Sequence, residues 1–313
     1  MVQLAGRASI DSPNAPALAV SRSNGHSMVD PLRRVMVCSP RTAGWNDADR
    51  AAPWRDLGYL HAPNFNGAQK QHDLLCEELA KAGVEIMELP AADDLSLDAI
   101  YAHDASLPTD YGLIALCPGK VNRVAEGKYH AAFCEAQGIR ELGEITPPAT
   151  AEAGDIVWLD AKTLLVGRGY RTNLAGISQL QNLLAPKGVS VVSAPLPHGQ
   201  GPSTCLHLMS LMSLLDVRTV LVDLPCLAVE TVELLRSLGY KLVEIDYSER
   251  DTLGCNVLAL GENRLLAVAE NEKTNARLSA SGFDVRTFPG SELCINGGGG
   301  PTCLTRPLLR VGS

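Results

Sequence analysis

The cysteine near the end of the chain is the residue best placed to do chemistry. Cys303 follows four consecutive glycines in the segment Asn296-Gly-Gly-Gly-Gly-Pro-Thr-Cys303. Ordering so many glycines costs conformational entropy, so we expect this backbone to approach another group closely or to adopt positive φ. A flexible linker is the alternative, but a strand-like apolar segment follows directly. The pattern favours a loop that presents the Cys303 thiol to a pocket, where backbone N–H groups and a base would stabilise the thiolate.

A cysteine nucleophile usually works with an imidazole, and the chain has seven histidines. His207 differs from the other six because it lies in the apolar segment Cys205-Leu-His-Leu-Met-Ser-Leu-Met. Such a segment would hold the ring rigidly at the start of a helix. His207 is therefore a candidate for the acid/base partner of Cys303, and its context alone leaves the other histidines open.

Glu152-Ala-Gly-Asp155 is a pair of carboxylates that precedes a strand-like segment. An ordinary turn would explain it, but a guanidinium offers paired N–H donors that match carboxylate oxygens. Further along, Gly167-Arg-Gly-Tyr-Arg-Thr-Asn173 contains Arg171, and also Arg168, either of which could bind a substrate carboxylate. Together these segments suit a substrate that carries both a guanidinium and a carboxylate.

A second acidic segment, Asp98-Ala-Ile-Tyr-Ala-His-Asp104, adds two carboxylates and the aromatic ring of Tyr101. We expect it at the edge of a strand or loop. Carboxylates and an aromatic face both attract cations, so this segment is again compatible with a cationic ligand.

The composition limits the classes of protein that can carry these residues. The chain has 313 residues, 46% apolar and 20% charged, which is a normal globular balance. Its formal charge of -8 and the lack of a Lys/Arg cluster argue against nucleic-acid binding. No apolar run approaches the roughly 20 residues of a membrane span, and no signal-peptide pattern opens the chain. We expect a cytoplasmic protein with a small-molecule substrate, without a membrane or nucleic-acid partner.

The nine cysteines show no CxxC pair and no His/Cys spacing of the zinc-binding kind. We expect most of them to be reduced and buried as small apolar residues. A disulfide framework is not expected, which leaves open whether one thiol is reactive.

The elements that would position these residues recur along the chain. Residues 1–30 are rich in Ser, Ala, Asn, Pro and Gly, and we expect an irregular arm there. From residue 31 to 313, short apolar runs such as 34–38 alternate with helical patterns such as 68–82. A unit of two or three strands and a helix recurs about five times, which predicts one α/β domain of similar modules around a pseudo-symmetry axis. A doubly wound Rossmann sheet is the rival, but no GxGxxG segment supports it.

Together the motifs resemble the guanidino-group-modifying (pentein) superfamily, which includes arginine deiminases, amidinotransferases and dimethylarginine dimethylaminohydrolases. The resemblance covers residues 33–309, nearly the whole chain. Its anchors appear in the family's order, and they are 98–104, 152–155, 171–173, 206–208 and 298–305. It implies a five-bladed α/β propeller of pseudo-symmetric ββαβ modules, with the active site in the central channel and no cofactor or metal. It also implies a homodimer.

The resemblance gives each matched residue a role. Cys303 would attack the guanidinium carbon, and His207 would move protons to the leaving amine and from water. Glu152 and Asp104 would bind and orient the guanidinium. Two arginines, Arg171 and Arg123, look like the residues that take the substrate's α-carboxylate, and Asp98 and Tyr101 match positions near the bound substrate.

Departures from the family patterns bear on the substrate. Arginine deiminases and amidinotransferases carry an Asp two residues after the histidine, where this chain has Met209. The dimethylarginine hydrolases lack that Asp, and segment 98–104 looks most like theirs. The glycine run before Cys303 looks more like the other two branches, and Ala153 replaces a usual Gly. We favour hydrolysis of a methylated arginine or a related guanidino acid, and first of all of dimethylarginine to citrulline and dimethylamine. The alternatives are an arginine deiminase or dihydrolase, an amidinotransferase, or a non-catalytic binding propeller, against which the presence of both Cys303 and His207 counts.

Overall fold

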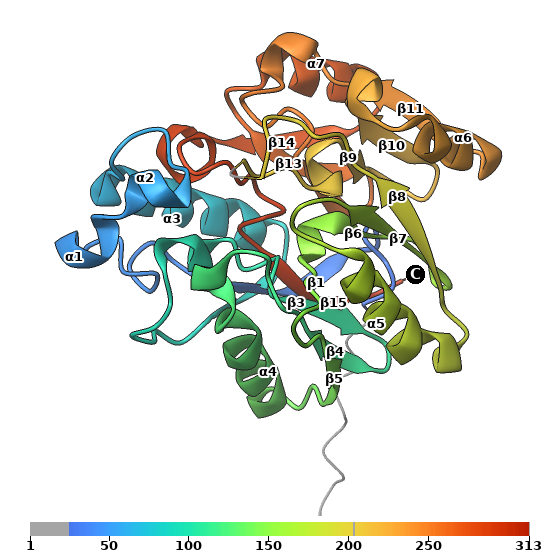
Figure 1. Ribbon diagram of the computed structural model, residues 1–313. Coiled ribbons are helices and arrows are strands. Elements are labelled where there is room, and N and C mark those ends of the chain that lie inside the picture. The colour runs from blue at the N-terminus through green and yellow to red at the C-terminus, as the bar shows by residue number, and fades with distance from the viewer. Residues whose placement is uncertain (1–24, 203, 313) are drawn as a thin grey trace, which may run out of the picture.

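The computed structural model describes residues 25–202 and 204–312 and shows five small sheets arranged around a common centre (Figure 1). Each sheet has three strands. The inner strand runs antiparallel to the middle strand, and the middle strand runs parallel to the outer one. The expected five-bladed α/β propeller of ββαβ modules is therefore confirmed.

From inner to outer strand, the five sheets are β15-β1-β2, β3-β4-β5, β6-β7-β8, β9-β10-β11 and β12-β13-β14. The strands span Leu32–Val37 (β1), Glu85–Glu88 (β2), Ser106–Thr109 (β3), Gly112–Ala115 (β4), Glu141–Glu144 (β5), Ile156–Asp160 (β6), Thr163–Arg168 (β7), Ser190–Pro195 (β8), Met212–Leu214 (β9), Thr219–Val222 (β10), Lys241–Glu244 (β11), Leu258–Gly261 (β12), Arg264–Val268 (β13), Asp284–Phe288 (β14) and Arg306–Arg310 (β15).

A helix joins the middle and outer strand of each sheet, as parallel neighbours require, and covers the outside of the ring (Figure 1). These helices are α3 (Phe65–Lys81), α4 (Glu126–Ala136), α5 (Leu174–Leu184), α6 (Val229–Ser237) and α7 (Glu272–Ala280). Two short helices, α1 (Ala48–Ala51) and α2 (Trp54–Leu57), precede α3. The apolar middle strands are buried between their helices and the channel-lining strands, for example Val220 and Leu221 of β10.

The sequence pattern locates the middle strands and helices well, but misses some inner and outer strands. The helix expected at 68–82 is α3, which begins where Asn64 caps the backbone N–H of Gly67. The inner strands β3 and β9 have only four and three residues. Ser106 and Ser213 are buried in them, so no apolar alternation marks these strands in the sequence.

The two ends of the described chain meet in one blade. β15 pairs with β1, with Val35 opposite Pro307. Residues 25–30 form bends, and His26 stacks on Trp158 with 3.9 Å between ring centroids. The rest of the predicted N-terminal arm, residues 1–24, lies outside the described residues.

Candidate active site

The candidate catalytic residues occupy equivalent places in different blades. Asp104 precedes β3, Glu152 precedes β6, His207 precedes β9 and Cys303 precedes β15. The fifth inner strand, β12, is preceded by Asn256, which contacts Cys303. Because the inner strands converge on the pseudo-symmetry axis, segments far apart in the sequence deliver these side chains to one end of the channel.

His207 and Glu152 form the shortest contact among them. Nε2 of His207 donates to Oε2 of Glu152 at 2.6 Å, and both side chains are buried. The other Glu152 oxygen, Oε1, accepts from the backbone N–H of Gly119 at 2.9 Å. Burial alone would raise the pKa of Glu152, but the imidazole and nearby arginines hold it well below its usual range. Glu152 is therefore a carboxylate at neutral pH.

The local backbone holds His207 in place. It caps the short 3₁₀ turn Leu208–Ser210, and Asp155 accepts from the backbone N–H of Leu208 at 2.9 Å. A side chain at Gly154 would come within 2.4 Å of His207 Nδ1, so only glycine leaves room for the ring. Burial would lower the pKa of His207, but the thiol of Cys205 and neighbouring carboxylates raise it well above the ordinary value. The imidazolium form is thus favoured.

Asp104 belongs to a buried cluster of charges. Its Oδ2 accepts from Nη1 of Arg123 at 2.7 Å, and its Oδ1 accepts from the backbone N–H of Gly154 at 3.1 Å. Arg123 also donates to both carboxylate oxygens of Glu126 and to the carbonyl of Tyr101. Its guanidinium is therefore largely occupied by the protein itself. The role that the resemblance implies for Arg123, binding of a substrate carboxylate, stays a prediction.

Cys303 lies next to this cluster. Its Sγ accepts a hydrogen bond from Nδ2 of Asn256 at 3.0 Å, and its carbonyl accepts from the backbone N–H of His103. Burial, with a further contribution from Asp104, raises the pKa of the thiol to about 12, although His207 and Asn256 act in the opposite direction. In the absence of a ligand the sulfur is therefore a thiol at neutral pH.

The glycine run behaves as its sequence predicts. Gly298 has a φ of 84°, in the left-handed region. A Cβ on Gly297 would lie 1.9 Å from the hydroxyl of Tyr101, and one on Gly299 would lie 2.3 Å from the ring of Tyr101. The run is thus packed against Tyr101 and is no linker, and its close packing fixes the loop that carries Cys303.

The other predicted substrate-binding residues lie around this centre. Nη1 of Arg171 lies 3.3 Å from each carboxylate oxygen of Glu152. Asp98 is buried, and its Oδ2 accepts from Nζ of Lys120 at 2.9 Å. The buried hydroxyl of Tyr101 has no hydrogen-bond partner among the described residues.

Three side chains next to the predicted site residues were not predicted from the sequence. Asn256 carries no sequence signal, because only the fold brings it to Cys303. Sγ of Cys205 lies 3.6 Å from Nδ1 of His207, and the spacing Cys-x-His in the sequence was its one signal. Lys120 gave none, since single lysines are common on surfaces. All nine cysteines are free thiols, and Cys205 is the exposed one.

Asp104, Glu152 and His207 also have the donor types and spacing of a metal site, because their ligand atoms lie within 4.8 Å of one another. Two of these atoms already form hydrogen bonds within the protein. Glu152 Oε2 is bonded to His207 Nε2, and Asp104 Oδ2 is bonded to Arg123. The cluster pairs carboxylates with cations and resembles a guanidinium cradle more than a set of free ligands.

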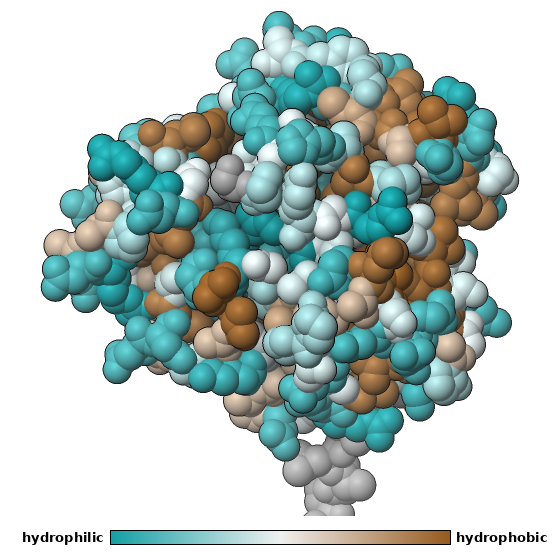
Figure 2. Space-filling model, viewed as in Figure 1, coloured by the Kyte–Doolittle hydropathy of each residue, from teal (hydrophilic) through white to brown (hydrophobic). Residues whose placement is uncertain are grey.

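Figure 2 shows a hollow near the centre of the face in view, with a hydrophilic wall and a rim that includes hydrophobic residues. Among residues 25–202 and 204–312, no helix has the length and hydropathy needed to cross a membrane.

Comparisons with known proteins agree with this arrangement. The arginine deiminase family matches residues 127–236 and 233–310. The N(G),N(G)-dimethylarginine dimethylaminohydrolase of Streptomyces coelicolor is 30% identical over 247 residues, which cover 76% of this chain and 84% of that protein. The chain therefore belongs to the arginine deiminase family, within the pentein superfamily, and is a guanidino-group-modifying enzyme.

Two solved structures share the fold. DDAH from Pseudomonas aeruginosa, in complex with citrulline, has a TM-score of 0.70 at 22% identity, covering 90% of this chain and 100% of that one. The N-terminal domain of ArgZ, an arginine dihydrolase from cyanobacteria, has a TM-score of 0.75 at 19% identity, covering 88% and 98%.

Proposed function

We propose that this protein hydrolyses a methylated arginine to citrulline and dimethylamine through a covalent intermediate on Cys303. The observation that carries the proposal is the convergence of Cys303, His207, Glu152 and Asp104 at one end of the channel. The family resemblance adds that Met209 stands at the sequence position where deiminases and amidinotransferases carry an Asp. The similarity to the Streptomyces coelicolor protein supports the same substrate class.

In the first half of the reaction, Glu152 and Asp104 hold the guanidinium, whose positive charge favours the Cys303 thiolate beside it. The thiolate attacks the guanidinium carbon and forms a C–S bond. Glu152 occupies Nε2 of His207, so Nδ1 is the nitrogen left to give its proton to the departing amine. The C–N bond then breaks, and dimethylamine leaves an amidino-thioether on Cys303.

In the second half, His207 takes a proton from water, and the oxygen attacks the same carbon. The C–S bond breaks and Cys303 leaves as the thiolate. The second proton of the water passes to solvent, and the neutral ureido group of citrulline remains. Because both carboxylates are fixed by backbone N–H groups, they need no reorganisation when charge moves during either step.

The remaining predicted residues divide into two roles. Arg171, which contacts only Glu152 among the acidic groups of the described chain, is proposed to take the substrate's α-carboxylate. Asp98 and Tyr101 are proposed to line the substrate site. Arg123 is better proposed as a positioning residue, because it holds Asp104 through Nη1. We also propose that residues 31–313 are a single catalytic domain, because β15 closes the ring against β1.

The runner-up reactions share the Cys303 intermediate and differ in what leaves and what attacks. An arginine deiminase or dihydrolase would release ammonia from arginine, and an amidinotransferase would pass the amidino group to a second amine. The family match to arginine deiminases favours the first of these over the second.

The test is to incubate the protein and its Cys303→Ser variant with asymmetric dimethylarginine and, separately, with arginine, and to identify citrulline and the released amine. Citrulline with dimethylamine, formed by the unmodified protein alone, is the expected result. Ammonia from arginine, without turnover of dimethylarginine, would move the assignment to a deiminase. Citrulline from neither substrate would reject both.

A further inference from the structure

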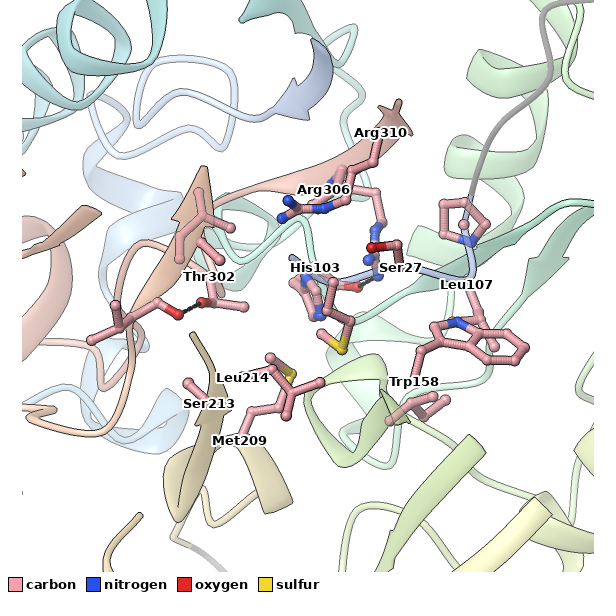
Figure 3. Close-up of a pocket in the computed structure, with 18 residues that line it drawn as sticks. Ser27, His103, Leu107, Trp158, Met209, Ser213, Leu214, Thr302, Arg306 and Arg310 are labelled. Carbon is pink, nitrogen blue, oxygen red and sulfur yellow. Dashed lines mark hydrogen bonds between the residues drawn. The ribbon is translucent and has the colours of Figure 1, made fainter. Parts of the chain in front are cut away.

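A small cavity with a partly polar wall lies where the five inner strands meet, and Figure 3 shows the residues that line it. All five inner strands contribute to its wall, through Arg306 of β15, Leu107 of β3, Trp158 of β6, Ser213 of β9 and Leu258 of β12. Its volume is about 30 Å³. One water molecule needs roughly 10–15 Å³ of such volume, so the cavity has room for one or two water molecules or for one small ion.

Two buried arginines give this cavity its charge. Arg306 and Arg310 are 6% and 3% exposed and both line it. Figure 3 shows the side chain of Arg310 extending from β15 toward Ser27. Within residues 25–202 and 204–312 neither arginine forms an ion pair, and no Asp or Glu is among the described residues that line the cavity. Two cations thus share a small space without a carboxylate in direct contact, which is costly in a protein interior.

Some donors in the wall have no acceptor among the described residues. Nε of Arg306 and Nε1 of Trp158 are buried without a partner in the described chain. Ser27 Oγ already accepts from the backbone N–H groups of Val29 and Asp30, which leaves its own hydrogen to donate. The bonds that Arg306 and Arg310 do make go to backbone carbonyls, those of His103, Ser106 and Asp30. These carbonyls accept hydrogen bonds from the guanidinium groups, but they do not neutralise the positive charge.

We infer that this cavity binds one halide-sized inorganic anion, such as chloride, held by Arg306 and Arg310. Such an ion would accept from the unpartnered donors and neutralise part of the buried charge, which a water molecule would not do. Burial lowers the pKa of Arg306 to about 9 and that of Arg310 to about 10, partly offset by Asp104 and Asp30 respectively. Both guanidinium groups therefore remain charged at neutral pH and need an anionic partner.

The anion would lie close behind the catalytic groups. The wall residues His103, Met209 and Thr302 stand one or two positions from Asp104, His207 and Cys303. Arg306 donates to the carbonyl of His103 at 2.9 Å, so the ion would stabilise the backbone that positions Asp104. The inference concerns binding and stability, and it does not depend on which guanidino substrate the enzyme takes.

The first test measures thermal unfolding at constant pH and ionic strength while sodium gluconate, too large for the cavity, is replaced stepwise by sodium bromide. We expect a saturable rise in Tm of roughly 5 °C at bromide about a hundredfold above its dissociation constant. Arg310→Gln should lose the response, whereas Arg277→Gln, at an arginine whose side chain is 47% exposed, should keep it. A rise that is linear, or equal in both variants, would overturn the site.

A second measurement holds even if Arg310→Gln fails to fold. Crystals of the unmodified protein grown in bromide should show an anomalous-scattering peak between Arg306 and Arg310. A cavity that contains only water at saturating bromide would refute the inference, whatever the Tm experiment gives.

Discussion

Oε2 of Glu152 lies 2.6 Å from Nε2 of His207, and both side chains are buried. The carboxylate fixes the ring and stabilises the imidazolium, which donates a proton in the proposed mechanism. Glu152→Gln keeps the size and loses the charge, so we expect kcat to fall by roughly 10²- to 10⁴-fold. The high-pH limb of the rate profile should move to lower pH, because the imidazolium loses its stabilising anion. An unchanged profile would leave Glu152 without this role.

The pH profile of the unmodified enzyme follows from the state of Cys303. Because burial raises the pKa of the thiol to about 12, the thiolate fraction grows as pH rises, and kcat/KM should increase from pH 6 upward. It should fall again where His207 loses its proton, whose pKa is raised well above the ordinary value by nearby Cys205 and carboxylates despite burial. Steady-state rates from pH 5 to 11 test this. A flat profile from about pH 6 to 9 would contradict the pair.

Thiol alkylation reports on Cys303 directly. In a Cys205→Ser background, which removes the exposed thiol, the rate of loss of activity with iodoacetamide should be low at pH 7 and rise steadily with pH. Asn256→Ala removes the donor that stabilises the sulfur anion and should slow alkylation further at a given pH. Equal rates in the two proteins would show that the Asn256 contact does not act on the thiolate.

Met209 offers a test of substrate choice. Met209→Asp would add an acceptor for an unmethylated N–H, so the ratio of kcat/KM for arginine over dimethylarginine should rise by about tenfold or more. Met209→Leu, the apolar control, should leave the ratio unchanged. Because the ratio is taken within one protein, a loss of folded enzyme does not affect it.

Arg123 separates positioning from substrate binding. Arg123→Met would leave Asp104 and Glu126 buried without their cation, and we expect a loss of about 3–5 kcal/mol in the free energy of unfolding. Urea denaturation measures this. Arg171→Met should instead raise KM with a smaller loss of stability. If Arg123→Met raised KM and left the free energy of unfolding unchanged, Arg123 would be a substrate-binding residue.

The glycine loop can be tested with neighbouring positions. Gly299→Ala places a methyl group against the ring of Tyr101 and should cost about 1–3 kcal/mol, with loss of activity as Cys303 is displaced. Gly298→Asn is the matched control, because Gly298 has positive φ but open space and Asn tolerates that conformation. Equal effects of the two changes would mean that close packing is not what the run provides.

The amino-acid sequence by itself identifies the repeated module and the candidate catalytic residues. Buried middle strands such as β10 and amphipathic helices such as α3 are local patterns, set by the period of apolar residues. The short inner strands escape detection, because β9 has three residues and its burial comes from the other blades. Cys303, His207, Glu152 and Asp104 are recognisable from the sequence, because each lies in a motif of only a few consecutive residues.

The tertiary structure decides which of these residues meet and in what charge state. Asn256 reaches Cys303 across 47 positions of sequence, and Arg123 pairs with Asp104 instead of remaining free. The buried pair Arg306 and Arg310 faces a cavity that five separate strands enclose. No local pattern encodes such relationships, since burial and pKa depend on neighbours that the chain supplies from other blades. The sequence thus determines the chemistry available, and the closed ring of blades determines how it is arranged.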